Sequence, residues 1–244
     1  MCGGTEWIAR FDEQGRTFAA PCECRAKNYM RRKLEFANIP PAYSDVTMEN
    51  FRMDVYQRQE TKKIIYAAGK AVSYYLENAE EFLQKGVGLY LYSRAKGSGK
   101  TRLVASIANE LVKNHQVRFA TSMNILEKIK ETWNQDKHDR NKYHETQLLH
   151  DLESVEILII DDFGTEGYAD WIDGKYYQII NQRYINKKAT FFTSNYRIED
   201  LPYDERIGSR VKECTFQIAF PEECVREYIA MENNKKMMKE AFAK

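Results

Sequence analysis

The segment Gly97-Ser98-Gly99-Lys100-Thr101 combines the residue types that bind a triphosphate. Glycines let backbone N–H groups approach an anion closely, because they carry no side chain and accept left-handed backbone conformations. A lysine supplies positive charge for the β- and γ-phosphates, and a threonine hydroxyl can bind Mg²⁺. This chemistry predicts an ATP site made by Lys96, Gly97, Ser98, Gly99, Lys100, Thr101 and Arg102.

The surroundings of the glycines favour this interpretation over a glycine turn that contains Gly-Lys-Thr by chance. A strand-like run, 87–92, precedes them, and a run with helical spacing begins near Lys100. The start of that helix adds partial positive charge beside the phosphates. Arg94 departs from the usual pattern, because it occupies the first glycine position of the phosphate-loop motif. We expect an ordinary backbone conformation there, an altered loop entrance and retained binding.

Two carboxylates, Asp161 and Asp162, follow a run of apolar, mostly β-branched residues at 155–160. A buried strand that ends in two acids places them at the carboxyl edge of a parallel sheet, where ligands bind. Asp161 is predicted to bind Mg²⁺ with Thr101, and Asp162 to orient or deprotonate the attacking water. The alternative is a pair of acids that cap a loop. A helix and a strand between this pair and the phosphate loop favour the catalytic interpretation.

Three further polar residues follow another strand-like run. Asn195 can hydrogen-bond a γ-phosphate or the attacking water, although a turn residue after a strand is an equally simple interpretation. Arg206 and Arg210 come next in Asp-Glu-Arg-Ile-Gly-Ser-Arg. An arginine can stabilise the charge that develops on a neighbouring subunit's γ-phosphate. The residues alone favour two surface arginines that pair with Asp204 and Glu205.

Helix-like and strand-like runs alternate through the part of the chain that carries these residues. Helices are expected at 57–83, 100–113 and 121–133, in a short segment that ends at about residue 152, and at 169–187 apart from Gly174. Strands are expected at 88–92, 117–120, 155–160 and 189–193, and 135–144 is expected to be a polar loop. Thr121 or Ser122 can cap the helix that follows it. Such alternation predicts an α/β fold with a parallel sheet and helices on both faces.

Composition excludes several classes of protein. Hydrophobic residues make up 43% and charged residues 30% of the 244 residues, with a formal net charge of +1, so the chain is not a strongly basic nucleic-acid-binding protein. No apolar run approaches the ~18 residues of a membrane span. Five cysteines and no signal-peptide pattern predict a reducing, cytoplasmic setting.

Residues 1–45 differ from the rest of the chain. They contain Cys2, Cys22 and Cys24, a basic stretch, and Pro40-Pro41, which interrupts any helix. The double proline predicts a domain boundary near residue 45.

As an ordered set, these motifs resemble the AAA+ ATPases of the DnaC/DnaI helicase-loader family, including phage versions, and the related IstB transposition ATPases. The resemblance spans residues 22–230 and rests on Ile39-Pro40 leading to Asn50-Phe51, the phosphate loop, Ile-Ile-Asp-Asp-Phe-Gly-Thr-Glu, Thr-Ser-Asn and Ile-Gly-Ser-Arg. It implies an α/β AAA+ P-loop NTPase with a five-stranded parallel sheet flanked by helices and a small N-terminal cysteine-containing extension. The implied domains are 1–45 for helicase docking, 46–232 for the ATPase, and a tail at 233–244.

The resemblance also assigns roles to residues. It implies that Asn195 is the sensor, that Arg210 acts in trans as an arginine finger during self-association, and that Arg226 is a weaker match to a second sensor. In the family, the N-terminal segment binds zinc, so Cys2, Cys22 and Cys24 would supply three of four ligands. The alternatives are a shortened chain, an unusual fourth ligand, or plain reduced thiols without zinc.

The implied function is an ATP-binding and ATP-hydrolysing DNA replication protein that loads a DnaB-type replicative helicase onto single-stranded DNA. Hydrolysis would need Mg²⁺, and it is expected to be slow and stimulated by partners. DNA contact is expected at Lys128, Lys130, Trp133, Lys137, Arg140, Lys142 and Tyr143, a region that is otherwise only a polar loop. The alternatives are an IstB-like transposition helper and a non-hydrolysing, nucleotide-gated DNA-binding module. A small-molecule kinase is disfavoured because no arginine-bearing lid is evident.

Overall fold

The computed structural model describes residues 2, 5–12, 14–133, 145–167 and 169–242. Its strands are β1 (Trp7–Phe11), β2 (Thr17–Pro21), β3 (Gly88–Tyr92), β4 (Val117–Thr121), β5 (Ile157–Phe163), β6 (Ala189–Ser194) and β7 (Thr215–Ala219). Its α-helices are α1 (Glu23–Ala37), α2 (Gln59–Glu77), α3 (Ala79–Gln84), α4 (Lys100–Leu111), α5 (Ser122–Trp133), α6 (Glu145–Ser154), α7 (Asp170–Ile185), α8 (Glu205–Glu213) and α9 (Arg226–Phe242). Short 3₁₀ turns lie at Pro41–Tyr43 and Ile198–Asp200.

Five strands form one parallel sheet in the order β4-β5-β6-β3-β7. This confirms the predicted α/β fold class. The register pairs Ile160 of β5 with Phe192 of β6, and Phe192 with Tyr90 of β3. The carboxyl ends of β3, β5 and β6 therefore meet at one edge of the sheet. The phosphate loop follows β3 and Asn195 follows β6, while Asp161 and Asp162 lie within β5, near its carboxyl end, rather than after it as predicted.

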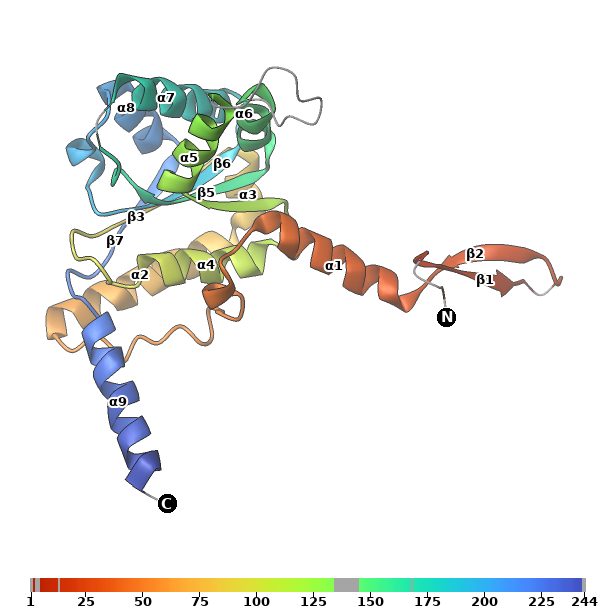
Figure 1. Cartoon of the computed structure of the whole chain (residues 1–244), viewed down its shortest axis with the longest axis horizontal. Helices are drawn as coiled ribbons and strands as arrows, with labels where there is room; N and C mark the ends of the chain where they lie inside the picture. Colours follow the sequence, from red (N-terminus) through yellow and green to blue (C-terminus); the bar gives the residue numbers. More distant parts are fainter. Residues whose placement is uncertain (1, 3–4, 13, 134–144, 168, 243–244) are drawn as a thin grey trace.

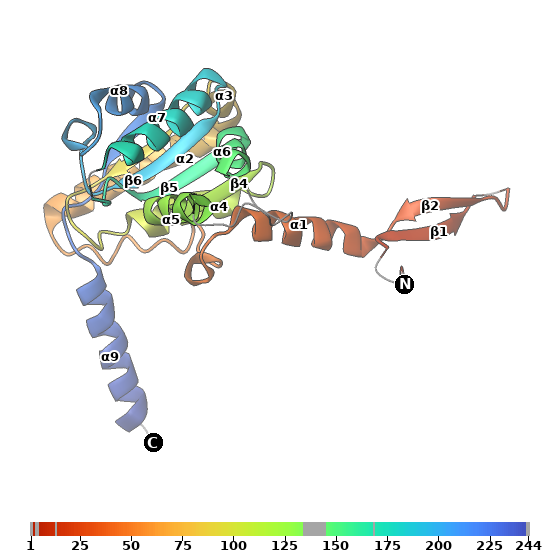
Figure 2. The same ribbon diagram turned by 45° about the horizontal axis from the view of Figure 1, so that its top comes forward.

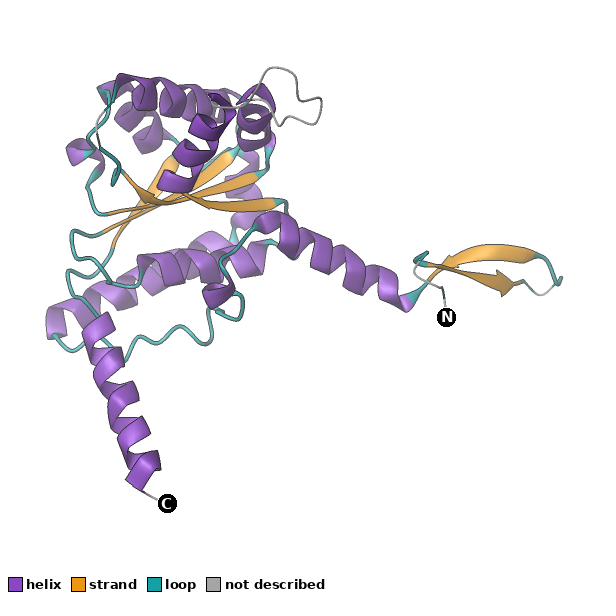
Figure 3. Ribbon diagram, viewed as in Figure 1, coloured by secondary structure: helices purple, strands orange, loops and turns teal. Residues whose placement is uncertain are grey.

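Helices cover both faces of the sheet. Figures 1 and 3 show α2 and α4 on one face and α5, α6, α7 and α8 on the other. The first layer packs through residues such as Val72, Val104 and Ile107, and the second through residues such as Ile129, Tyr176 and Ile179. Strand β5 is buried along nearly its whole length, which explains its continuous apolar sequence.

Two elements extend away from this body, as Figures 1 and 2 show. One is α9, and the other is α1 together with the antiparallel hairpin β1–β2. The hairpin is attached to α1 by Arg25, whose guanidinium lies 4.2 Å from the centre of the Trp7 ring, and by an Arg32–Glu6 ion pair of 3.1 Å. Helix α9 runs unbroken across the expected boundary at residue 232.

Two helix predictions differ from the structure in detail. The run expected at 57–83 is divided at Asn78, which ends α2 and precedes α3. Gly174 does not interrupt α7. The residue pattern predicts neither β1 nor β2, because the two short strands lack a clear alternation of apolar and polar residues. No helix in the described ranges is both long and apolar enough to cross a lipid bilayer.

Arg183 of α7 is fully buried and connects α6, the segment just before β5, and β6. Its guanidinium donates to the carbonyls of Leu152, Val155 and Ala189 at 2.7, 2.8 and 2.6 Å, and to Thr190 Oγ1 at 2.8 Å. Burial lowers the pKa of this guanidinium to about 9, so it stays protonated at neutral pH. One side chain thus satisfies several carbonyls that have no access to water.

Replacing Arg183 by methionine should lower the free energy of unfolding by about 3 kcal/mol or more, because buried carbonyls lose their donors. Urea denaturation followed by circular dichroism measures the change. The matched control is Lys212→Met on α8, an exposed residue with a surface ion pair to Glu199, which should cost less than about 1 kcal/mol. Equal effects of the two substitutions would contradict the role of Arg183.

Candidate nucleotide site

The phosphate loop connects β3 to α4 and needs glycine at two positions. Gly97 and Gly99 have φ values of +77° and +99°. A Cβ atom would lie 2.9 Å from Cδ of Arg226 at Gly97, and 3.0 Å from the Tyr56 hydroxyl at Gly99. The Tyr56 hydroxyl also donates to the Ser98 carbonyl at 2.7 Å. Backbone conformation and lack of space therefore both explain the two glycines.

Lys100 lies inside this loop with its ammonium group turned toward the backbone. Its Nζ donates to the carbonyls of Ser93 and Ala95 at 3.1 and 3.2 Å, and to Asn195 Oδ1 at 3.1 Å. Burial lowers the pKa of the ammonium, while the negative charges of Asp162, Glu222 and Asp161 raise it. The lysine is thus a poorly hydrated cation that gains strongly from an anionic ligand.

A hydrogen bond joins the loop to the acidic end of β5. The Thr101 hydroxyl donates to the Asp161 carboxylate at 2.9 Å, and Thr193 of β6 donates to the same carboxylate at 2.5 Å. Burial raises the pKa of the Asp161 carboxyl to about 6, against the lowering effect of these two donors. A buried carboxylate beside a threonine hydroxyl is a donor set that fits Mg²⁺, which binds oxygen ligands.

Asp162 turns away from Asp161 because the strand is irregular at this point. The pairing of β5 with β6 shifts register between Ile160 and Phe163, and Asp162 has a left-handed backbone with φ +56°. Its N–H donates to Thr193 Oγ1 at 2.9 Å. Aspartate tolerates this conformation better than most residues. The bulge buries Asp161 and exposes Asp162, so the two carboxylates have different surroundings.

These residues surround one cavity of about 390 Å³. It is lined by Tyr43, all seven residues from Lys96 to Arg102, Asp162, Thr165, Asn195, Val225, Arg226 and Ile229. The structure therefore brings Asp162 and Asn195 to the same cavity as the predicted ATP-binding residues. The glycine cradle, the buried lysine and the Thr101–Asp161 pair fit a magnesium-bound triphosphate.

Several residues that line the cavity carry no sequence signal, and Arg226 is only a weak match to a second sensor. Tyr43, Val225 and Ile229 contribute an aromatic ring and two aliphatic side chains from outside the two main motifs. Tyr43 follows the Pro40-Pro41 pair, which in the sequence indicates only a domain boundary. No local pattern marks these residues, because long-range packing alone places them at the cavity.

Arg94 has an ordinary backbone conformation with a negative φ, as expected. Its guanidinium pairs with Asp200 at 3.1 Å and is largely exposed. Its backbone N–H and that of Ala95 each donate to the Glu222 carboxylate at 2.9 Å. The loop entrance thus uses a carboxylate from a distant segment at the point where the motif has glycine.

The two candidate arginines lie outside the cavity, on α8. Arg210 lies 4.6 Å from the centre of the Tyr184 ring and 3.6 Å from the Glu213 carboxylate. Arg206 pairs with Asp204 at 2.8 Å, as the surface alternative predicts. Neither arginine lines the cavity of its own chain.

The three N-terminal cysteines come together at the start of α1. Their sulfur atoms all lie within 4.8 Å of one another, and those of Cys2 and Cys24 are 3.3 Å apart. Hydrogen bonding with Cys2 and Cys22 raises the pKa of the Cys24 thiol to about 12. Three sulfur donors fit zinc chemically, but no fourth His, Cys, Asp or Glu of the described residues joins the group.

The candidate DNA-contacting residues are only partly described. Lys128, Lys130 and Trp133 lie on α5, which Thr121 caps by accepting the N–H of Asn124 at 3.2 Å. Lys130 Nζ lies 5.2 Å from the centre of the Trp171 ring, and the Trp133 and Trp171 rings are 4.9 Å apart. Lys137, Arg140, Lys142 and Tyr143 fall outside the described residues.

Comparison with known proteins agrees with this geometry. A family model described as "IstB-like ATP binding protein" matches residues 21–205. The replicative helicase loader DnaC of Escherichia coli (strain K12) is 30% identical over 212 residues, which cover 85% of this chain and 78% of the relative. This chain belongs to the DnaC-like group of that ATP-binding family. The DnaC of Buchnera aphidicola subsp. Baizongia pistaciae (strain Bp) is 28% identical over 211 residues, covering 85% of this chain and 80% of the relative.

Solved structures confirm the AAA+ fold of the DnaC-like chain. A crystal structure of the DnaC helicase loader covers 71% of this chain and 98% of its own, with a TM-score of 0.57 and 23% identity. A crystal structure of DnaI covers 80% and 100%, with a TM-score of 0.54 and 23% identity. Replication initiator DnaA, bound to AMPPCP and single-stranded DNA, covers 82% and 56%, with a TM-score of 0.56 and 18% identity.

Proposed function

We propose that this protein is an ATP-hydrolysing loader that delivers a DnaB-type replicative helicase to single-stranded DNA. The observation that carries the proposal is that Lys100, Thr101 and Asn195 line one cavity of a DnaC-like chain, while the buried Asp161 carboxylate accepts a hydrogen bond from Thr101. The relatives named replicative helicase loader DnaC support the cellular role. The geometry supports the nucleotide chemistry.

Each residue at the cavity has a proposed part. The N–H groups of residues 97–101 and Lys100 bind the phosphates, while Thr101 and Asp161 hold Mg²⁺. The metal neutralises charge on the phosphates when it is bound. Asp162, exposed at the bulge, orients or deprotonates water, and Asn195 senses the γ-phosphate from the end of β6. Lys96 and Arg102 add positive charge to the two ends of the loop.

Arg210 is proposed to act on the cavity of a neighbouring subunit. It is partly exposed on α8 and is held against Tyr184 and Glu213 within its own chain. An arginine that reaches a neighbour's γ-phosphate stabilises the transition-state charge and holds the two subunits together. Loss of the γ-phosphate would then loosen the assembly, which suits a release step.

Two single variants, Asp162→Asn and Arg210→Ala, test this division of labour. Each alone should lower ATP turnover by on the order of a hundredfold, because each removes one half of a shared site. A mixture of the two should recover measurable turnover at sites between unlike subunits. There the Arg210→Ala subunit provides Asp162, and its Asp162→Asn neighbour provides Arg210. Steady-state phosphate release in the presence of single-stranded DNA measures the turnover of each variant and of the mixture.

The matched control for Arg210 is Arg206→Ala, which changes a second exposed arginine of α8 and should leave turnover within twofold. A mixture as inactive as its components would place Arg210 outside the neighbour's site. Unchanged turnover in Asp162→Asn would remove Asp162 from catalysis. Wild-type protein that binds ATP without hydrolysing it would favour the nucleotide-gated DNA-binding alternative.

Residues 1–45 are proposed to dock on the helicase, residues 46–232 to form the ATPase, and 233–244 to form a tail. The hairpin β1–β2 extends from the body and exposes Trp7, Phe11 and Phe18 by 45%, 70% and 48%. Exposed aromatic side chains on a projecting element are typical anchors of protein interfaces. Lys128, Lys130 and Trp133 of α5 remain the proposed DNA contacts.

Zinc is a proposed structural cofactor of this docking segment. The clustered thiols of Cys2, Cys22 and Cys24 would hold it between the start of the hairpin and the start of α1. Zinc binding requires the thiolates, so it would release protons from thiols such as Cys24. A fourth ligand would come from water or from outside the described residues.

Replacing both Phe11 and Phe18 by glutamate in the full chain should reduce capture by a DnaB-type helicase at least tenfold, because an apolar anchor becomes charged. Basal ATP turnover should remain within twofold, since neither residue lines the cavity. Pull-down with purified helicase measures capture. The control is Tyr66→Glu, an aromatic residue of α2 that is 59% exposed. Equal capture by all three proteins would refute docking through the hairpin.

The IstB-like transposition helper is the second candidate. The same nucleotide site would serve it, and the family model that matches the chain carries that name. Capture of a transposase in place of the helicase in the same pull-down would favour it. The 30% identity with DnaC, over an alignment that covers 85% of this chain, favours the loader over the transposition helper.

A further inference from the structure

The segment that follows β7 lies along the phosphate loop from its start to its tip. The N–H of Phe220 donates to the Tyr92 carbonyl at 2.7 Å, and Ser93 Oγ donates to the Pro221 carbonyl at 2.9 Å. Further on, the N–H of Val225 donates to the Gly97 carbonyl at 3.1 Å. This segment is therefore a second wall of the loop, contributed by sequence more than 120 residues away.

Glu222 closes the entrance of the loop. One carboxylate oxygen accepts the N–H of Arg94 and the other accepts the N–H of Ala95, both at 2.9 Å. These are the first two amides after Ser93, at the position where the phosphate-loop motif has glycine. Hydrogen bonds to an ionised carboxylate are stronger than neutral ones. The carboxylate therefore fixes two successive peptide units that glycine would leave free to adapt.

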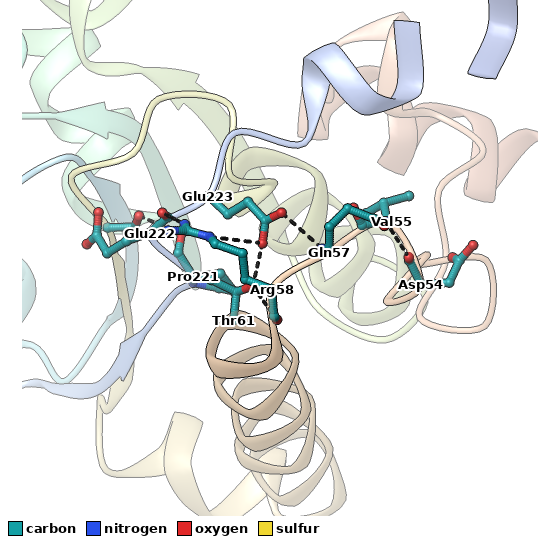
Figure 4. A network of polar contacts seen from close by, with 9 residues as sticks. Asp54, Val55, Gln57, Arg58, Thr61, Pro221, Glu222 and Glu223 are labelled. Carbon is teal, nitrogen blue, oxygen red and sulfur yellow. Dashed lines mark hydrogen bonds and ion pairs between the residues drawn. The ribbon is translucent and has the colours of Figure 1, made fainter. Parts of the chain in front are cut away.

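Glu223 anchors the same segment on its other side, as Figure 4 shows. Its carboxylate accepts the N–H of Gln57 at 2.9 Å and the hydroxyl of Thr61, and lies 3.8 Å from Arg58 Nε. The Arg58 guanidinium also donates to the carbonyl of Glu222. Two adjacent carboxylates thus connect the start of α2 with the entrance of the phosphate loop.

We propose that Glu222 is a positioning residue for ATP binding, and that its carboxylate holds the entrance of the phosphate loop in its binding conformation. This inference rests on the proposed function, because ATP is taken as the ligand. A loop that is ordered before binding loses less conformational entropy when the phosphates arrive. Glu222 does not line the cavity, so it acts through the Arg94 and Ala95 amides.

Preorganisation and catalysis make different predictions for kinetics. If Glu222 only shapes the loop entrance, its loss weakens ATP binding and raises KM, while kcat is retained because Asp162 and Asn195 are unchanged. The charge of Glu222 is close enough to Lys100 to raise the pKa of that ammonium. If Glu222 acts chiefly through this charge, neutralising Glu222 would tighten ATP binding, because its repulsion of the phosphates would be removed.

Glu222→Gln and Glu222→Ala test the proposal in the full chain. Each should raise the Kd for magnesium-ATP about tenfold, equivalent to about 1.4 kcal/mol, with kcat within twofold. Competition against a fluorescent ATP analogue gives the Kd, and phosphate release gives KM and kcat. The control is Glu223→Gln, which replaces one of the two oxygens that accept from Gln57 and Thr61, changes no contact to the loop, and should leave the Kd within twofold.

Hydrogen exchange of the same proteins without nucleotide separates this inference from the proposed function. Peptides that contain residues 94–99 should exchange faster in both Glu222 variants and at the wild-type rate in Glu223→Gln. An unchanged or tighter Kd in Glu222→Gln, or unchanged exchange of the loop in both Glu222 variants, overturns the positioning role of Glu222. Wild-type protein that binds no ATP would overturn the proposed function, and the exchange result would still decide whether Glu222 orders the loop.

Discussion

The site depends on the parallel alignment of β3, β5 and β6, which brings their carboxyl ends to one edge of the sheet. The Asp161 carboxylate of β5 accepts a hydrogen bond from Thr101, at the start of α4 after the phosphate loop. It accepts another from Thr193 of β6. Asp161 is therefore held from both sides before any ligand contributes. If the strand order were different, Lys100 and Asn195 would not line one cavity, and Asp161 would not reach Thr101.

Burial gives these residues their chemical character. Lys100 and Asp161 are both removed from water, and burial shifts the pKa of each toward the neutral form. Such groups gain more from a charged ligand than exposed ones, because their interaction is weakly screened. The bulge after Ile160 then exposes Asp162, so that one buried and one accessible carboxylate come from consecutive residues. Metal binding and water activation can thus be assigned to different side chains.

The sequence predicted the local elements of this arrangement well. Gly97 to Thr101, Asp161 and the strand β5 carry their chemistry in contiguous residues, so residue type and spacing were sufficient. Tyr43, Glu222 and the hairpin β1–β2 were not predicted, because their positions depend on contacts between segments that are distant in sequence. Arg94 shows the difference most clearly: the sequence marked it as a departure from glycine, and only the structure showed that Glu222 holds its amide. Arg210 stays a prediction, since its role requires a second subunit.

The central claim is that the glycine loop, Lys100 and the Thr101–Asp161 pair form a binding site for magnesium-ATP. Isothermal titration calorimetry of the full chain with ATP, in the presence of Mg²⁺ and again with excess chelator, tests it most directly. The account predicts saturable binding of one ATP per chain with Mg²⁺, weaker binding with chelator, and none in a folded Lys100→Ala variant. Folded wild-type protein that takes up no ATP, or a Lys100→Ala variant that binds it equally well, would contradict the account.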